Sequence, residues 1–478
     1  MTEGPLLGKI ILFVLPLMAT NLLQVLYNAA DMMVVSLSVE PDAVGAIGTT
    51  GSLISLILNI FIGFATGTNV VLAQRLGAKE EGEASRTVHT SLILSLILGG
   101  VAGTVGFIFA RPILSLMGAE AKLLDLATTY IQIYCICIPF VSLTNYASAI
   151  FRAKGDTKTP MFVLSLAGIA NVAMNLFFVL VCGLSVEGVA LATGISNALS
   201  ALVLLILLAR DDGPCRFDFK RLGINKRAFL SILRIGFPAA IQGSLFSISN
   251  IVILSSVLRV NNMMAPIGAP YQPVVKANAA VGNLESFVYN ATNSVYQAAM
   301  TFTSQNVGAG KYDRINRVLG CCLLFTSVIA IVLSGSVLLL NKPLLALYGV
   351  VDGVEGTCEH IAYNAAMTKL LCSTLPYILL AWMDVGCGMV RGLGKSVAST
   401  IICLIGSCLL RIVWIYTIFE YFKTLESIYL SYPVSWFLTA LVLLVFSLVL
   451  TNKELKKRRA ENGGEQRDTS DIAESVEA

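Results

Sequence analysis

Charge is scarce in this sequence. Aspartate, glutamate, lysine and arginine make up 13% of the 478 residues, 56% are hydrophobic, and the mean hydropathy is +0.78. A water-soluble protein of this length needs more charge to cover its surface. Charge-free runs such as 43–74, 126–151, 159–186 and 427–452 exceed the roughly 20 residues with which a helix crosses a bilayer. The composition therefore predicts an all-α polytopic membrane protein.

Signatures of an enzyme are missing as well. There are two histidines, His89 and His360, which are expected near opposite faces of the membrane. The sequence has no phosphate-cradling glycine loop and no nucleophile motif. The 11 cysteines lie mostly inside apolar runs, where free cysteine packs as a small hydrophobic residue, and they follow no disulfide or zinc pattern. We therefore expect no catalysis and no cofactor, and any pumping must draw on an ion gradient.

Twelve membrane spans are expected, and lysine and arginine orient them. The approximate bounds are 9–37, 44–75, 87–110, 123–152, 159–182, 185–209, 228–258, 279–306, 316–341, 360–390, 397–421 and 425–451. Basic residues gather in alternate loops, which predicts a multi-pass protein of the cell membrane with both termini cytoplasmic. No cleavable signal precedes the first span, so we expect it in the mature protein. The net charge of +4 reflects this topology and not nucleic-acid binding.

The two halves of the sequence repeat one another. AQRLGAKEEGEASR at 73–86 corresponds to SQNVGAGKYDRINR at 304–317, and FRAKGDTKTP at 151–160 corresponds to VRGLGKSVAS at 390–399. Each half holds an even number of spans, so both enter the membrane from the same side and form parallel repeats. Two pseudo-symmetric six-helix bundles around a central cleft are predicted. The predicted parts are an N-terminal bundle (1–209), a cytoplasmic linker (210–227), a C-terminal bundle (228–452) and a disordered cytoplasmic tail (453–478).

One carboxylate interrupts the first apolar run. Asp31 ends a polar stripe with Asn21, Gln24 and Asn28, which fall on one helical face. A charge in mid-bilayer is costly and by default marks a function, which makes an ion site or a wet cavity the first interpretation. The alternative is a buried acid that neighbouring helices satisfy, or one near the outer interface. Pro16, about 22 Å earlier along the helix, is a hinge candidate.

Other spans carry polar residues that fit a cavity. Asn171 and Asn175 share one face of the fifth span, as Thr193 and Asn197 do in the sixth. Taken alone, such pairs more often join helices than form a site. The residues predicted to line a substrate cavity are Gln24, Tyr27, Asn28, Asn290, Asn293 and Gln297.

The second half carries its charges elsewhere. Glu285, Asp384 and Arg411 fall in the eighth, tenth and eleventh spans. They form either a structural network, in which opposite charges neutralise each other, or a second coupling or substrate site. The sequence leaves both interpretations open.

The ordered set of motifs resembles the multidrug and toxic compound extrusion (MATE) family. The similar segments are PLMATNLLQVLYNAADMMVV, the AQRLGAK and SQNVGAGK loops, FRAKGDTKTP and GVALAT. The resemblance runs from about residue 9 to residue 451. It implies a V-shaped pair of bundles that exports amphipathic compounds, as a monomer in the lipid bilayer, in exchange for protons or sodium ions.

The resemblance also implies roles for particular residues. In the family's proton-coupled branch, an acid of the first helix works with an asparagine and an acid of the fifth helix and a threonine of the sixth. Asp31, Asn171 and Thr193 fit this pattern, whereas Asn175 stands where the second acid would be. These four residues are the predicted cation-coupling site. Their oxygens could bind Na⁺, whereas a proton needs only Asp31.

The sequence therefore predicts a secondary active multidrug exporter that works by alternating access. A lipid-linked saccharide flippase of the same superfamily is the nearest alternative, and it should have a more cationic cavity to hold a pyrophosphate. Arg411 is the one basic residue expected well inside a span, which argues against a flippase. A channel is a further alternative, and a channel would need no coupling acid.

Overall fold

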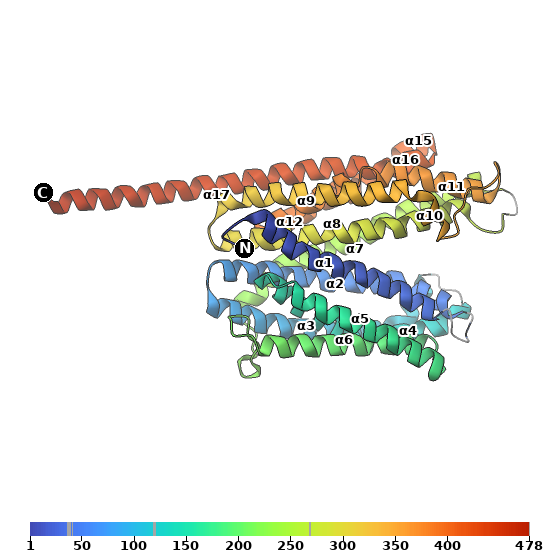
Figure 1. The fold of residues 1–478 in the computed structure, drawn as a ribbon, viewed down its shortest axis with the longest axis horizontal. Helices are drawn as coiled ribbons and strands as arrows, with labels where there is room; N and C mark the ends of the chain where they lie inside the picture. The colour runs from blue at the N-terminus through green and yellow to red at the C-terminus, as the bar shows by residue number, and fades with distance from the viewer. Residues whose placement is uncertain (36–39, 41, 118–120, 267–268, 478) are drawn as a thin grey trace.

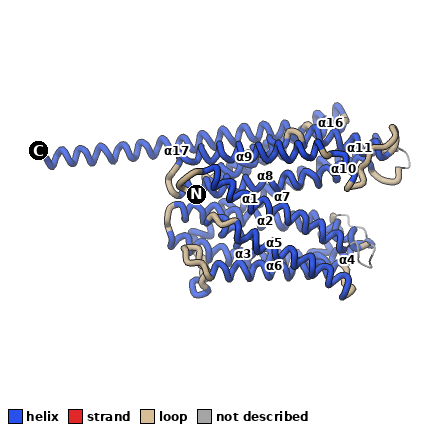
Figure 2. Tube along the Cα trace, in the orientation of Figure 1, coloured by secondary structure: helices blue, strands red, loops and turns tan. Residues whose placement is uncertain are grey.

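The computed structural model describes residues 1–35, 40, 42–117, 121–266 and 269–477. Helices form almost all of this part, and no strand occurs in it, which confirms the all-α prediction (Figure 2). The helices of the first half are α1 (Leu6–Val35), α2 (Ala43–Gly77), α3 (Glu81–Leu116), α4 (Ala121–Lys154), α5 (Lys158–Leu176) and α6 (Val186–Ala209). Those of the second half are α7 (Lys226–Met264), α8 (Pro273–Gly308), α9 (Tyr312–Leu339), α10 (Asn341–Ala346), α11 (Cys358–Lys369), α12 (Tyr377–Gly392), α13 (Ser396–Cys403), α14 (Leu410–Trp414), α15 (Glu420–Phe422), α16 (Leu425–Tyr429) and α17 (Ser431–Glu477).

Ten of the described helices are long and apolar enough to cross a membrane, or eleven if a bent pair counts as one span. The bent pair is Cys358–Thr374 with Tyr377–Gly392, whose axes differ by 41°. Pro376 lies in the break, where its ring and missing N–H end a helix. α8 is as long as the others, with 36 residues, but asparagine, glutamine, serine and threonine make it too polar for the same criterion.

Short π-helical turns interrupt three of the spans. They are Phe177–Val181 after α5, Leu370–Thr374 after α11, and Leu404–Leu409 and Ile415–Phe419 on either side of α14. Each such turn adds a residue to the helical repeat and so rotates the faces that follow it. A polar stripe read from 3.6-residue spacing is therefore reliable in α1 and α8 but not across the eleventh span.

The helices form two groups that lie side by side (Figure 1). α2–α6 make up one group, and α7–α17 make up the other. The predicted linker 210–227 lies between α6 and α7 and contains the 3₁₀ turn Phe219–Arg221. His89 on α3 holds this linker, because its Nε2 accepts from the backbone N–H of Asp218 at 3.1 Å and its ring stacks on Phe217.

α1 contacts both groups. Its first half packs on α8 and α9, with the Phe13 and Phe302 rings edge to face at 5.6 Å. Asn21 still belongs to this contact, since its amide donates to Asn290 O at 3.2 Å and to Ser294 Oγ at 3.1 Å. From Tyr27 onward the helix packs on α5 instead, where the Tyr27 hydroxyl donates to Ser165 O at 3.0 Å. The crossover falls after Pro16, the predicted hinge.

Residues 453–478 were predicted to be a disordered tail, but the structure continues α17 as a helix to Glu477, and Figure 1 shows it projecting beyond the bundles. The chain has no proline after Pro433 to stop the helix. The first tail residues, KELKKRR at 453–459, are strong helix formers.

The two groups meet along α2 and α7, where Gly63 lies against the backbone of Ala240, and at one end, where the α2–α3 turn meets the α8–α9 turn. A methyl group built on Gly77 would overlap the backbone of Gln305, and one built on Gly308 would overlap the backbone of Gln74. Gln74 Nε2 donates to Gly392 O at 3.0 Å, and Gln305 Nε2 donates to Ala153 O at 2.7 Å. These two glutamines occupy equivalent positions of the sequence repeat. We call this symmetric set of contacts the clamp, and the end that it joins the closed end.

The segment before α1 also lies at the closed end. Arg314 Nη2 donates to Gly4 O at 2.9 Å, and Lys311 Nζ donates to Thr2 O at 3.2 Å. Lys311 also hydrogen-bonds the exposed Glu3 at 3.3 Å and thereby lowers the pKa of its carboxyl group. The start of the chain is thus tied to the α8–α9 turn.

Candidate functional site

A cavity of about 550 Å³ lies between the two groups, within the usual size range of small-molecule sites. Its walls come from α1, α2, α4, α5 and α6 on one side and from α7, α8 and α12 on the other. All six residues predicted to line a substrate cavity do line it: Gln24, Tyr27, Asn28, Asn290, Asn293 and Gln297. The helical stripes of α1 and α8 therefore face one another across the same space.

Asp31 lies on the wall of this cavity and is hydrogen-bonded to α5. Asn175 Nδ2 donates to Asp31 Oδ1. The Asn171 amide satisfies its neighbours best with its nitrogen toward Asp31 Oδ1, at 2.9 Å, and its oxygen toward the backbone N–H of Thr193, at 3.2 Å. The four residues of the predicted cation-coupling site are therefore in one cluster, which three different helices supply.

The cluster offers oxygen atoms for a hard cation. Asn175 Oδ1 is buried without a hydrogen-bond partner in the described structure. Asp31, Asn171 and Thr193 supply further carboxylate, amide and hydroxyl oxygens beside it. Oxygen is the ligand that hard cations prefer. The donor set thus fits Na⁺, while no group of three or more His, Cys, Asp or Glu side chains in the described residues could hold a transition metal.

A glycine on α5 lets α1 come close enough to form this cluster. A methyl group built on Gly168 would overlap the ring of Tyr27. We expect Gly168→Ala to push α1 away from α5 and to lower the free energy of unfolding by about 1–3 kcal/mol, the usual cost of overpacking. Thermal unfolding in detergent measures this loss.

The matched control is Gly100→Ala on α3, where a methyl group meets nothing within 4 Å. Removing a glycine from an open helical position should stabilise the protein slightly. If both variants gain stability alike, the Tyr27–Gly168 contact does not set the distance between α1 and α5.

The acids of the second half lie apart from one another. Asp384 lines the cavity, and its Oδ2 is buried without a hydrogen-bond partner in the part of the chain that is described. Glu285 is not among the residues that line the cavity, and it forms an ion pair with Lys369, with Oε2 and Nζ 3.3 Å apart. Arg411 is buried against the rings of Tyr432 and Trp436. Within the described ranges, no ion pair joins Arg411 to either acid, so the three residues do not form the single neutralising network that was one of the two interpretations left open.

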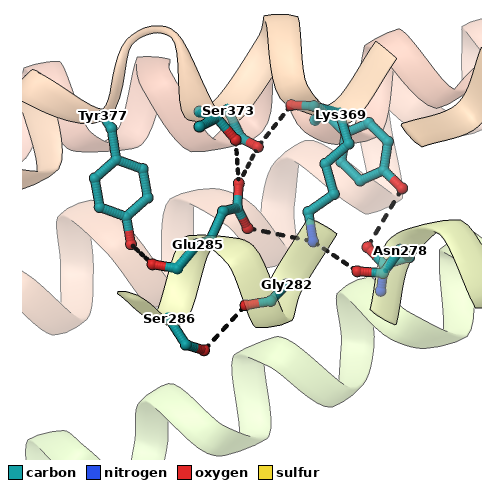
Figure 3. A network of polar contacts seen from close by, with 9 residues as sticks. Asn278, Gly282, Glu285, Ser286, Lys369, Ser373 and Tyr377 are labelled. Carbon is teal, nitrogen blue, oxygen red and sulfur yellow. Dashed lines mark hydrogen bonds and ion pairs between the residues drawn. The ribbon is translucent and has the colours of Figure 1, made fainter. Parts of the chain in front are cut away.

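The Glu285 group is instead a compact network around the bend between α11 and α12 (Figure 3). Glu285 Oε1 accepts from Ser373 Oγ at 2.5 Å and from Thr374 Oγ1 at 3.0 Å. Lys369 Nζ also donates to Asn278 O at 3.0 Å. Every charged atom of the Glu285–Lys369 pair therefore has a partner. Because these partners lie on α8 and on the bent α11–α12 helix, the network joins the two.

Comparison with known proteins identifies the family. The MatE family model matches residues 16–177 and 238–417, which are the two halves of the repeat. The chain belongs to the MatE family. The resemblance seen in the sequence is thereby confirmed, and so is the expectation of a transporter rather than an enzyme.

Individual relatives of the MatE chain are distant but cover most of it. It is 27% identical to the probable multidrug resistance protein YoeA of Bacillus subtilis over 442 residues, which cover 90% of this chain and 91% of YoeA. It is 26% identical to the FAD transporter of Shewanella oneidensis over 329 residues, 67% of this chain and 70% of the relative. A solved outward-facing multidrug resistance MATE transporter superposes with a TM-score of 0.85 at 19% identity, covering 95% of this chain and 98% of that one. This likeness confirms the twelve-helix fold of a multi-pass membrane protein.

Sequence reasoning missed two buried charges and one partly buried charge of this MatE chain. Lys369 and Arg391 are buried inside helices, although Arg411 was the one basic residue expected there. Arg391 lines the cavity, and so does Arg152 on α4. A signal was available, because FRAKGDTKTP and VRGLGKSVAS align Arg152 with Arg391. The argument against a flippase that rested on a cavity poor in basic residues therefore loses its basis, because two arginines line the cavity.

Proposed function

We propose that this MatE-family chain is a secondary active exporter of amphipathic compounds that exchanges its cargo for protons or sodium ions. The observation that carries the proposal is the cavity between the two helix groups, closed at one end by the clamp and holding the Asp31 cluster in its wall. A carboxylate in a membrane cavity has a use if a cation binds and leaves it during each cycle. The names of the multidrug relatives support the same cargo class.

The proposed coupling site is Asp31 with Asn171, Asn175 and Thr193. A bound proton or Na⁺ would neutralise Asp31 and let its side chain stay against α5. Loss of the cation would leave a charged carboxylate, which is more stable in contact with water. Because the cluster joins α1 to α5, the presence of the cation and the packing of α1 depend on one another. Na⁺ would use the amide and hydroxyl oxygens, whereas a proton would need only the carboxylate.

The proposed orientation puts the closed end in the cytoplasm. The basic loops at Arg75–Arg86 and Lys311–Arg317 lie at this end, and positive loops favour the cytoplasmic side. The cavity then opens outward, and both termini are cytoplasmic. One chain contains both walls of the cavity, which supports a monomer as the working unit.

Accumulation of ethidium in cells without their own exporters tests the proposal. We expect the wild type to lower accumulation, and a protonophore or removal of sodium to abolish this effect, depending on the coupling ion. Asp31→Asn should lose the response to the gradient at equal membrane expression. Asp125→Asn makes the same change at an exposed carboxylate that pairs with Arg111, and it should behave as wild type.

Two results would contradict parts of the proposal. Export by Asp31→Asn that still follows the gradient would move coupling to another acid, with Asp384 the first candidate in the cavity. Passive movement of dye in both directions, without any gradient dependence, would support a channel.

A further inference from the structure

The floor of the cavity carries two arginines in equivalent positions of the repeat. Arg152 lies in the last turn of α4, and Arg391 lies in the last turn of α12. Both line the cavity. The residues that follow them, Ala153 and Gly392, provide the carbonyl oxygens that the clamp glutamines hold. The two guanidinium groups therefore belong to the closed end, one from each side.

Arg391 is buried, and neutral groups hold it in place. Nη1 donates to Tyr296 OH at 2.6 Å, Nη2 donates to Gln242 Oε1 at 2.7 Å, and Nε donates to Ser399 Oγ at 3.3 Å. No described carboxylate lies within ion-pair distance of it. Asp384 is on the same face of α12, two turns away, which is about 10 Å along the axis. The charge of Arg391 is thus fixed in position and lacks an ion-pair partner there.

Arg152 is only partly buried, but its charge lacks an ion-pair partner too. Its Nε is buried without a hydrogen-bond partner, and it forms no ion pair with any residue that the structure describes. Its neighbour Lys154 has a partner of its own, Asp211, at 2.9 Å. A buried cation without a counterion is unfavourable. Arg391 is buried and Arg152 partly buried, and two cations facing one cavity repel one another, so an anion bound between them would reduce both the burial cost and the repulsion.

We propose that Arg152 and Arg391 bind an anionic group of the cargo, so that the preferred substrates are amphipathic compounds carrying a phosphate, sulfonate or carboxylate. The inference rests on the proposed exporter function and names its substrate class. Guanidinium groups bind such anions through paired, charge-assisted hydrogen bonds. Arg391 has two N–H groups left after its three protein contacts. The anion would lie at the floor, directly above the clamp.

The remainder of the cavity suits the uncharged part of such a compound. Tyr289 and Tyr296 supply ring faces, and Asn290, Asn293 and Gln297 supply amides for directed hydrogen bonds. Asp31 and Asp384 would accommodate a cationic or hydrogen-bond-donating group further from the floor. A cargo with an anionic group at one end therefore has a single preferred orientation in the cavity.

A pair of flavins that differ by one phosphate group tests this proposal. We would measure the affinity of the purified protein in detergent for FMN, riboflavin and ethidium by flavin or dye fluorescence anisotropy. We expect FMN to bind about 10-fold or more tightly than riboflavin, since a charge-assisted hydrogen-bond pair is worth at least that much. Arg152→Gln and Arg391→Gln should each reduce FMN affinity about 10-fold, while riboflavin and ethidium change less than about 3-fold.

Two further variants distinguish loss of the site from loss of the fold. Arg391→Lys keeps the charge and should recover part of the FMN affinity. Arg411→Gln removes another buried arginine of the same helix group, one that contacts Ser435, Tyr432 and Trp436 and does not line the cavity. It should leave the preference for FMN unchanged. Retained ethidium binding checks that each variant is folded.

The outcomes separate this inference from the proposed function. Equal affinity for FMN and riboflavin, or an FMN preference that survives in the double Arg→Gln variant, overturns the inference even if cells export ethidium. An arginine-dependent FMN preference supports it even if ethidium is not exported. If short-chain phosphatidylglycerol displaces FMN at a lower concentration than FMN itself, the anion belongs to a lipid headgroup, and the assignment to a small-molecule cargo is wrong.

Discussion

A single methyl group at residue 77 should keep the closed end from forming. Gly77→Ala places a carbon atom against the Gln305 backbone, and Gly308→Ala does the same against Gln74. Overpacking of this kind costs about 1–3 kcal/mol, which lowers the population of a conformation about 5- to 150-fold. Because only the closed arrangement makes these contacts, the variants should favour opening at this end. Export should fall toward the background, since one half of the cycle is then poorly populated.

Distances between spin labels at positions 86 and 317 report this opening. Both side chains are exposed near the closed end, on α3 and α9. In a Cys182→Ser background, which removes the one exposed cysteine of the described residues, we expect longer distances in Gly77→Ala than in the wild type. Gly82→Ala has open space around the new methyl group and should resemble the wild type in distance and export. Unchanged distances in Gly77→Ala would mean that the turns can shift without separating the two helix groups.

Removing one partner of the Glu285–Lys369 pair should cause a large loss of stability. The two side chains are 16% and 7% exposed, so Lys369→Met leaves a nearly buried carboxylate without its cation. Breaking a buried pair in this way costs about 3–5 kcal/mol. Glu285→Gln combined with Lys369→Met leaves no charge unpaired and should recover much of the loss, which unfolding in detergent can measure.

An exposed pair in the same helix group is the control. Arg259 and Glu420 are 3.0 Å apart, with half of each side chain in contact with solvent. Glu420→Gln should cost less than about 1 kcal/mol, as exposed ion pairs usually do. If the double variant is stable and still exports ethidium, the Glu285 network is structural. A stable double variant that has lost export would make Glu285 and Lys369 a second functional site.

The sequence predicted the residues around Asp31 better than the group Glu285, Asp384 and Arg411, and the reason is local geometry. Gln24, Asn28 and Asp31 share a face of an uninterrupted helix, so their spacing was enough to direct them into one cavity. Glu285, Asp384 and Arg411 lie on three different elements, and no spacing rule states which of them meet. Arg411 also follows the π-helical turn Leu404–Leu409, which rotates its side chain away from the face that regular spacing gives.

The buried partners were missed for a related reason. Lys369 ends α11 shortly before the bend of the tenth span, whereas Arg391 lies in the last turn of α12, and both side chains are buried. Contacts with neighbouring helices hold them there: Lys369 bonds Glu285 and Asn278 of α8, and Arg391 bonds Tyr296 of α8 and Gln242 of α7. Such a contact depends on tertiary structure, which hydropathy does not contain. The sequence repeat predicts the position of Arg391 better than hydropathy does, because it pairs Arg391 with Arg152 whatever their depth in the membrane.

α1 connects the two helix groups. Its Phe13 half is fastened to α8, and its Tyr27 half is fastened to α5, so the two halves of the protein cannot rock against one another while this helix stays straight and keeps both attachments. Asp31 lies one turn beyond the second attachment, with Asn175 as its fastening to α5. A cation that holds Asp31 against α5, or releases it, would therefore determine how much of α1 can bend. Ion binding and rocking would then be two descriptions of one movement, without any signal passing between separate sites.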